Sequence, residues 1–391
     1  MSSSKKLPLL IVGAGIGGLT AARALRRAGY DVEVFEQSKS FSPVGAGIGV
    51  MANGMKALRT LELDQAIMEK GAAFNHFSIR KADGTQLWAA SEKYLKKVCS
   101  PSYGIMRPAL HRILLDGCEG VSIHSDHRLE NFTQDNAGVT AYFSNGREVR
   151  GQALIGADGL RSRTRELLLG YHAPRNVGMT AVLGHLDAST ITNTEEISFR
   201  MGNGQSYIGF PVSKSVYMWS VMIKADKNGM DINTATLGGS DGGRTIGKDF
   251  LLKQFADWSS PVPELISNTD EKNYIRWDIF DRPYSKVWGK GRVTLLGDAI
   301  HPMAPTFGQG ANQSIEDAIE LAKSLSTSDD IISGLRCYEK RRQLRSRWIV
   351  EVAHKFVYFS LVTNPLVIKF RNGMLPVSNN FILGAALKWK G

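Results

Sequence analysis

The sequence predicts an α/β protein with a Rossmann-like nucleotide-binding domain, an inserted, mostly antiparallel β-sheet domain and a C-terminal helix. Three observations support this fold class. An apolar strand, a glycine-rich turn and a helix follow one another over residues 9–27. Runs with strand character, such as Val216–Ile223 with its two different faces, fill the middle, and a long helix is expected after residue 331. A chain of 391 residues is long enough for two domains.

The composition is that of a globular protein, with 43% hydrophobic residues and a formal net charge of +11. A solvated basic surface is the simplest interpretation of the charge, and attraction of an anionic ligand such as a dinucleotide phosphate is the functional one. Nucleic acid is disfavoured because the basic residues are dispersed and accompany no recognised binding motif. The cysteines form no CxxC pair, which indicates free thiols in a reducing compartment and a cytoplasmic location: Cys99, Cys118 and Cys337.

No segment is expected to span a membrane. Leu7–Val12 is too short for a signal-peptide core, and Phe356–Ile368 is interrupted by Asn364 and Pro365. The densest basic run lies on a predicted helix near this second apolar stretch, and it leaves open a weak peripheral contact with an anionic membrane surface. This run comprises Lys340, Arg341, Arg342, Arg345 and Arg347.

The first motif has the order expected of an adenine-dinucleotide site. Leu9–Val12 form a buried strand, a helix follows the glycines, and a second strand, Asp31–Phe35, ends at Glu36. Glu36 is placed to accept hydrogen bonds from ribose hydroxyls, which fits FAD or NAD and disfavours NADP. A plain tight turn is the alternative, and the motif alone does not separate FAD from NAD. The glycines that let the backbone and the helix amides approach a pyrophosphate are Gly13, Gly15 and Gly18.

Two further segments lie later in the chain. In Ala153–Arg165 a buried strand leads into a turn at Asp158 and a helix start that Ser162 would cap. In Arg292–Asn312 a strand is followed by Asp298, by a turn rich in proline and glycine, and by a helix with one apolar face. Together with the first motif, these segments resemble the group A, single-component FAD-dependent monooxygenases of the para-hydroxybenzoate hydroxylase type. The pattern is most similar to the branch of salicylate and 6-hydroxynicotinate hydroxylases and zeaxanthin epoxidases.

The resemblance implies a glutathione-reductase-type FAD domain and a role for each motif. Asp158 would lie near the FAD pyrophosphate, in a segment linked to handling of the reduced nicotinamide, and Asp298 would hydrogen-bond a ribityl hydroxyl. The following helix would direct its amino end at the flavin pyrimidine ring and stabilise the reduced flavin. The residues assigned to this turn and helix start are Gly308, Gly310, Ala311 and Asn312.

Two shorter matches extend the resemblance. Pro43–Gly49 is similar to the family's loop beside the flavin ring and assigns Gly47 to the cofactor site. Met106–Leu114 is similar to a helix start that bears an FAD-contacting arginine. Arg107 is assigned this role in preference to Arg112, with an ordinary surface arginine as the alternative.

The chain is expected to divide into an FAD domain and a substrate domain, each assembled from separate segments: residues 1–74, 101–172 and 285–330 for the first, and residues 75–100 and 173–284 for the second. Residues 331–391 are expected to supply a long helix and a short tail. Gly238–Gly243 lacks a preceding apolar strand and is interpreted as a mobile loop rather than a phosphate site. In the family NAD(P)H docks transiently, which agrees with one nucleotide-binding domain.

The resemblance implies that NAD(P)H reduces a tightly but non-covalently bound FAD and that O2 then reacts at the flavin. One oxygen atom would pass to a small aromatic or polyene-like substrate, by hydroxylation or by epoxidation. The protein has to provide a dry pocket, a positioned substrate and often a base. Candidate pocket residues, with sheet packing as the alternative for each aromatic ring, are Phe210, Tyr217, Trp219 and Pro305.

Tyr217 is the candidate catalytic residue, since its hydroxyl would bond or deprotonate a substrate hydroxyl. The ordinary tyrosine pKa of about 10 favours a hydrogen-bond donor over a base. His76 and His185 are alternative bases, although a lone histidine on a strand is more often structural. Arg200 is either the partner of a substrate carboxylate or, more simply, a surface arginine.

Other function classes fit less well. The sequence lacks the WxWxIP-type signature of a flavin halogenase, and His301 has no partner at metal-ligand spacing. The competing functions are an FAD-dependent reductase or dehydrogenase of the same fold, and a non-enzymatic FAD-binding redox sensor. A monomer or homodimer that takes a small-molecule substrate is expected.

Overall fold

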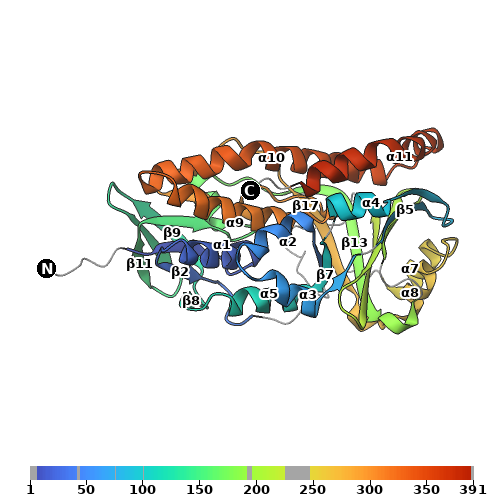
Figure 1. Cartoon of the computed structure of the whole chain (residues 1–391), viewed down its shortest axis with the longest axis horizontal. Coiled ribbons are helices and arrows are strands. Elements are labelled where there is room, and N and C mark those ends of the chain that lie inside the picture. The colour runs from blue at the N-terminus through green and yellow to red at the C-terminus, as the bar shows by residue number, and fades with distance from the viewer. Residues whose placement is uncertain are drawn as a thin grey trace.

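The protein is elongated, with two sheet-containing halves that lie side by side along two long C-terminal helices (Figure 1). The computed structural model describes residues 7–41, 45–74, 76–99, 101–191, 196–224 and 247–388. Pro43 and Val44 of the first shorter match, and the glycine-rich loop Gly238–Gly243, lie outside the described residues.

The first half is built on a six-stranded sheet in the order β18-β19-β12-β1-β2-β8. Its strands are parallel apart from β18, which pairs antiparallel with β19. The three sequence motifs follow β1, β12 and β19, so they meet at the carboxyl edge of neighbouring parallel strands, where α/β proteins bind ligands. The strands are β1 (Leu9–Val12), β2 (Val32–Phe35), β8 (Ser122–His124), β12 (Ala153–Gly156), β18 (Gly289–Lys290) and β19 (Val293–Leu295).

Helices cover one face of this sheet and a small sheet covers the other. Alternate residues of β1 explain the two layers, because Leu9 and Ile11 pack against the helices while Leu10 and Val12 pack against the sheet β11-β10-β9. The elements are α1 (Ile16–Arg27), α2 (Ala52–Arg59), α3 (Asp64–Lys70), α5 (Arg107–Asp116), α6 (Arg163–Leu169), α9 (Gly310–Ser326), β9 (Leu129–Gln134), β10 (Val139–Phe143) and β11 (Glu148–Gly151).

The second half is built on a seven-stranded sheet in the order β17-β13-β16-β15-β14-β5-β6. Neighbours are antiparallel except β14 and β5, which confirms the expected mostly antiparallel sheet. Two helices, α7 and α8, pack on one face, and the C-terminal helices pack on the other. The bounds are β5 (His76–Lys81), β6 (Gln86–Ala89), β13 (Arg175–Asp187), β14 (Glu196–Met201), β15 (Gln205–Pro211), β16 (Val216–Lys224), β17 (Ile275–Asp281), α7 (Lys248–Gln254) and α8 (Val262–Asn268).

A small sheet, β3-β7-β4, joins the two halves. Two of its glycines allow the close approach. A Cβ atom on Gly104 would lie 1.9 Å from the Pro211 carbonyl oxygen, and one on Gly47 would lie 2.3 Å from Val212 Cγ1. The remaining elements are β3 (Gly47–Val50), β4 (Ala72–Ala73), β7 (Tyr103–Met106), α4 (Glu92–Tyr94), a π-helical turn η1 (Leu95–Cys99), and 3-10 turns at Ala188–Thr190, Glu271–Asn273, Gly297–Ala299 (η4) and Pro305–Phe307 (η5).

The end of the chain forms two helices, α10 (Ile331–Ser360) and α11 (Pro365–Leu387), where one helix and a short tail were expected. Asn364 and Pro365, interpreted as an interruption, begin the second helix. The Asn364 side chain accepts hydrogen bonds from the backbone N–H groups of Leu366 and Val367, and proline suits the first helical turn. Among the described residues, no helix combines the length and the apolar character needed to cross a bilayer.

Candidate functional site

The glycine-rich turn between β1 and α1 forms an open cradle of backbone amides. Gly13 has a φ of +105°, and a Cβ atom on it would lie 2.4 Å from the Ala157 carbonyl oxygen. A Cβ atom on Gly18 would lie 1.9 Å from the Gly13 carbonyl oxygen, so a turn this tight requires glycine at position 18. Gly15 precedes α1 and provides no side-chain cap, and nothing lies within 4 Å of the position of its missing Cβ. Free amides at an open helix N-terminus fit a phosphate group.

Glu36 lies where the sequence predicts, at the end of β2, and its carboxylate binds the surrounding loops. One oxygen accepts the Ala14 N–H at 2.8 Å and the other accepts the Ser38 N–H at 2.9 Å. A carboxylate has about four acceptor positions, so two remain for ribose hydroxyls. Contact with ribose stays a prediction.

Asp158 organises the turn that follows β12. Its carboxylate accepts the Ser162 hydroxyl at 2.5 Å and both the N–H and the hydroxyl of Thr164, at 2.9 and 3.0 Å. Burial raises the pKa of Asp158, and these hydrogen bonds oppose the rise. Ser162 caps α6 as predicted, since its hydroxyl oxygen accepts the Arg165 N–H. The described contacts of Asp158 are therefore structural ones.

Asp298 follows β19 at the carboxyl edge of the parallel sheet, where its exposed but closely surrounded side chain indicates a recess. Its side chain is accessible to solvent, yet protein atoms surround it closely enough for burial to raise the pKa of its carboxyl. The charges of His301 and Arg107 oppose that rise. A hydrogen-bonding carboxylate in a concave site fits a ligand that carries hydroxyl groups.

The amino end of α9 opens onto the same recess. A Cβ atom on Gly310, the first residue of the helix, would lie 3.8 Å from an Asp298 carboxylate oxygen. Gln309 precedes the helix without capping it, and the first turn holds no acidic residue. Gly308 adopts a φ of +61°, which favours glycine and turns the chain into the helix. The first amides of α9, at Gly310 and Ala311, are thus available to an electron-rich ring edge.

Asn312 binds the protein rather than the open recess. Its amide nitrogen donates to the Gly49 and Gly308 carbonyl oxygens at 2.9 and 2.7 Å, and its oxygen accepts the Met51 N–H at 3.0 Å. A Cβ atom on Gly54 of α2 would lie 2.1 Å from that oxygen. Asn312 therefore joins β3 and α2 to the start of α9.

The two shorter matches lie beside the recess. Arg107 begins α5, its N–H donates to the Ala46 carbonyl oxygen at 3.0 Å, and its side chain is exposed. Because its charge lowers the pKa of Asp298, the guanidinium lies within electrostatic reach of the recess. A side chain at Gly47 would meet Val212 and Met218 of the apolar cluster around Phe210.

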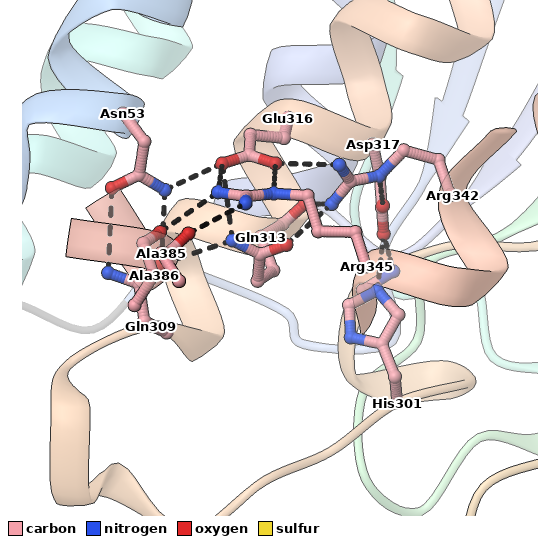
Figure 2. Close-up of polar contacts among 11 residues, drawn as sticks. Asn53, His301, Gln309, Gln313, Glu316, Asp317, Arg342, Arg345, Ala385 and Ala386 are labelled. Carbon is pink, nitrogen blue, oxygen red and sulfur yellow. Dashed lines mark hydrogen bonds and ion pairs between the residues drawn. The ribbon is translucent and has the colours of Figure 1, made fainter. Parts of the chain in front are cut away.

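A buried charge network anchors α9 behind this site (Figure 2). Arg342 of α10 donates to Glu316 and to Asp317, each at 2.6 Å, and to the Gln313 side chain at 2.7 Å. Burial alone would raise the pKa of Asp317, but the charges of His301 and Arg342 lower it to about 2. A second Asp317 oxygen accepts the Gly297 N–H at 3.0 Å and lies 2.6 Å from His301 Nε2.

The network extends to α2 and α11 (Figure 2). Arg345 donates to both oxygens of Glu316, at 2.7 and 2.8 Å, and to the carbonyl oxygens of Ala385 and Ala386 at the end of α11. Asn53 of α2 donates to Glu316 at 2.7 Å. These residues were not identified as a network from the sequence. The signal in the sequence was the acid pair Glu316–Asp317 among apolar residues of one predicted helix, followed by two arginines three residues apart, Arg342 and Arg345, on the next helix.

The basic run of α10 is only partly exposed, because Lys340, Arg341 and Arg347 reach solvent while the other two residues are engaged in the network. Arg342 is buried, and Arg345 is largely occupied by Glu316. Arg341 pairs with Glu320 at 2.8 Å, and Arg347 pairs with Glu351 at 2.8 Å. Much of the charge in this run is matched by acids of this chain.

The predicted pocket residues separate onto different surfaces. Phe210 packs edge-on against Phe74, with ring centroids 5.5 Å apart, in an apolar cluster that also holds Met51, Met218 and Ala304. Met51 and Ala304 flank the start of α9, so this cluster borders the recess. Pro305 is exposed and begins η5, the turn that leads to the same helix.

Tyr217 and Trp219 lie on the opposite face of the sheet, so their assignment to one pocket with Phe210 is corrected. Both are buried against α7 and α8, and Trp219 Nε1 donates to Thr269 Oγ1 at 2.8 Å. Burial raises the pKa of Tyr217 to about 12, which disfavours a base. Alternation along β16 explains the error, because the chosen residues had the wrong parity to share a face with Phe210.

Arg200 and the two candidate histidines lie on strands of the seven-stranded sheet. Arg200 is buried rather than on the surface, and it donates to the backbone and side-chain oxygens of Ser259 at 2.9 and 2.6 Å. His76 is exposed at the first position of β5, and His185 is half-buried in β13. In the described part of the chain no three histidine, cysteine or acidic side chains form a group suited to a metal ion.

Comparison with known proteins gives the context of this site. The FAD binding domain family matches residues 6–353. The chain is 34% identical to aurachin C monooxygenase/isomerase of Stigmatella aurantiaca, over 90% of this chain and 87% of that protein. It is 33% identical to zeaxanthin epoxidase of Solanum lycopersicum over 87% of this chain, but it spans only 53% of that longer protein.

A solved structure shares the whole fold. The crystal structure of Klebsiella pneumoniae HpxO complexed with FAD and uric acid superimposes with a TM-score of 0.86 and 27% sequence identity. The match covers 97% of this chain and 96% of that one. The recess at the carboxyl edge of the parallel sheet is thus part of a fold that holds FAD in a similar protein.

A first prediction concerns the clamp between α2 and α9. Gly54→Ala places a Cβ against the side-chain oxygen of Asn312, an amide that three hydrogen bonds hold in place, so we expect a loss of about 1–3 kcal/mol in the free energy of unfolding. Gly373→Ala in α11, with open space around it, should be neutral or stabilising by up to about 1 kcal/mol. Thermal unfolding of both variants checks this; equal effects would contradict the clamp.

A second prediction concerns the charge network. Arg342→Met leaves two buried carboxylates without their main partner, so we expect the free energy of unfolding to fall by roughly 3–5 kcal/mol. Arg347→Met, on the same helix, removes an exposed pair and should cost less than about 1 kcal/mol. Urea unfolding measures both. A small effect of Arg342→Met would show that Glu316 and Asp317 do not depend on it.

Proposed function

The chain belongs to the FAD binding domain family and is an FAD-dependent monooxygenase of the para-hydroxybenzoate hydroxylase type, and we propose that it uses NAD(P)H and O2 to oxygenate a hydrophobic aromatic or polyene-like compound. The observation that carries the proposal is the recess in which Asp298, the amino end of α9 and the apolar cluster around Phe210 meet. The first two groups suit a flavin and the third suits its substrate.

The residues present fit FAD along its whole length. The cradle at Gly13–Gly18 would hold the pyrophosphate, Glu36 the adenosine ribose and Asp298 the ribityl chain. When bound, FAD would supply the chemistry itself, by accepting electrons from the nicotinamide and activating O2. The amides at the start of α9 would stabilise negative charge on the reduced ring, since a helix N-terminus carries a partial positive charge.

The substrate is proposed to bind over the apolar cluster. Phe74, Phe210, Met51 and Met218 belong to this cluster, and their carbon and sulfur atoms would exclude water and accommodate flat rings of different shape. The similarity to an aurachin C monooxygenase and to zeaxanthin epoxidases supports a hydrophobic substrate. With Tyr217 on the far face, positioning over the flavin rather than a tyrosine base would be the protein's contribution.

A cytoplasmic location is proposed on the cysteines. Cys118 and Cys337 are both free thiols, as the spacing predicted, and such thiols are typical of a reducing compartment. Burial raises the pKa of Cys118 to about 11, which makes it an unreactive core residue.

A third prediction tests the activity. The purified protein should show a flavin absorbance, and one compound in a panel of aromatic and polyene substrates should accelerate NAD(P)H oxidation and gain one oxygen atom by mass. O2 uptake should match product, with little H2O2. NAD(P)H turnover without O2 uptake would indicate a reductase instead, and the lack of any turnover despite bound flavin would favour a redox sensor.

A fourth prediction tests the polyol site. Asp298→Ala removes a charged hydrogen-bond acceptor, worth about 1.5–3 kcal/mol, so FAD affinity should fall roughly 10- to 100-fold. Asp257→Ala, at an exposed position in the other half, should leave the affinity unchanged. Quenching of flavin fluorescence measures both dissociation constants. Unaltered affinity in Asp298→Ala, with an intact fold by circular dichroism, would remove Asp298 from the site.

A further inference from the structure

The outer face of α11 carries a stripe of apolar side chains that no described residue covers. Phe370 is 65% exposed and Phe381 is 74% exposed. At 100° per residue, these side chains and three others fall within an arc of about 100° on the helix surface. The full stripe comprises Leu366, Val367, Phe370, Met374 and Phe381. Isolated exposed apolar residues are ordinary, but a continuous stripe indicates an interaction surface.

The opposite face of α11 is firmly attached to the protein. Leu375, Leu383 and Leu387 are buried in the apolar cluster of the substrate half. Arg371 is buried and donates to the carbonyl oxygens of Gly202 and Ser360, each at 3.3 Å. Together with the bonds from Arg345 to the end of α11, these contacts hold the helix in one orientation. A helix that is apolar on both faces requires a second apolar environment on its outer side.

The charges around the stripe are positive. The sequence contains no aspartate or glutamate after Glu351, while Lys355, Lys369 and Lys388 occur there. The adjacent α4–η1 segment adds exposed Lys93 and Lys97. It is held against α11 by Tyr94, whose hydroxyl donates to the Asn380 carbonyl oxygen at 2.7 Å. The one acid of this segment, Glu92, pairs with Lys96.

We propose that α11 docks the enzyme on an anionic lipid surface. The helix would lie in the plane of the interface, with Phe370 and Phe381 among the acyl chains and Lys93 and Lys97 at the headgroups. With 23 residues α11 is long enough to cross a bilayer, but it is not apolar enough to do so. A second copy of this chain fits less well, because both partners would bring the same positive border into contact.

This surface adjoins the proposed substrate site. Leu375 and Leu383, on the inner side of α11, belong to the same apolar cluster as Phe210. When the protein is docked, only α11 would separate the membrane from the substrate site, so a substrate dissolved in the membrane would be close to it. This consequence rests on the proposed function. The docking itself does not depend on catalysis and is tested separately.

The test is co-sedimentation of the full-length holoenzyme with two kinds of vesicle, phosphatidylcholine alone and an equal mixture with phosphatidylglycerol. We expect binding to the anionic vesicles and little to the neutral ones. Phe370→Ser with Phe381→Ser should lower binding by more than about tenfold, since each ring contributes a large apolar area. Phe250→Ser, an exposed phenylalanine on α7, is the matched control and should bind like the wild type.

The charge contribution has its own variant. Lys93→Gln with Lys97→Gln should weaken binding to anionic vesicles roughly fivefold per lysine and leave FAD content unchanged. Absence of vesicle binding by the wild type would overturn the proposal, as would equal losses in the Phe250→Ser control. A dimer in light scattering that the Phe370/Phe381 variant dissociates, without wild-type vesicle binding, would assign the stripe to a second copy instead. Normal turnover with failed vesicle binding would leave the proposed function standing.

Discussion

The Arg342 guanidinium is the group on which the arrangement of the site depends. It is buried between Glu316 and Asp317, and each ion would be costly in the interior without the other charges around it. Asp317 also receives the Gly297 N–H, so one carboxylate holds both the turn after β19 and the helix that follows it. The polar recess and the amino end of α9 therefore keep a common position because a single ionic cluster lies behind them. Arg345 carries the same cluster on to the end of α11.

Local motifs allowed most of the fold to be predicted, together with the positions of the residues assigned to the cofactor, whose contacts with FAD stay predictions. The turn at Gly13–Gly18 and the residues after β12 and β19 carry their geometry in a few neighbouring positions, since left-handed glycines, caps and strand ends are short-range features. Membership of one parallel sheet then brings the three segments to a single edge. The roles of Asp158 and Asn312 were less accessible, because both side chains serve the protein's own backbone and hydroxyl groups.

The remaining features depend on contacts between distant segments. The face on which Tyr217 and Trp219 lie follows from which helices cover each side of the sheet, and α7 and α8 come later in the chain. The burial of Arg342 could not be predicted from the basic run, because its acidic partners lie about 25 residues earlier, on α9. The second C-terminal helix was missed because Asn364 and Pro365 were interpreted as an interruption, whereas they begin a new helix four residues after α10 ends at Ser360. In each case the local pattern was compatible with two structures, and tertiary packing decided between them.

A crystal structure of the protein with FAD bound tests the central claim most directly. The account predicts that the pyrimidine edge of the flavin accepts hydrogen bonds from the first amides of α9, at Gly310 and Ala311, and that a ribityl hydroxyl contacts Asp298. It also predicts that Arg342, Glu316 and Asp317 keep their contacts unchanged behind the ring. A flavin bound elsewhere, or an α9 that shifts away from the ring with the network broken, would contradict the account.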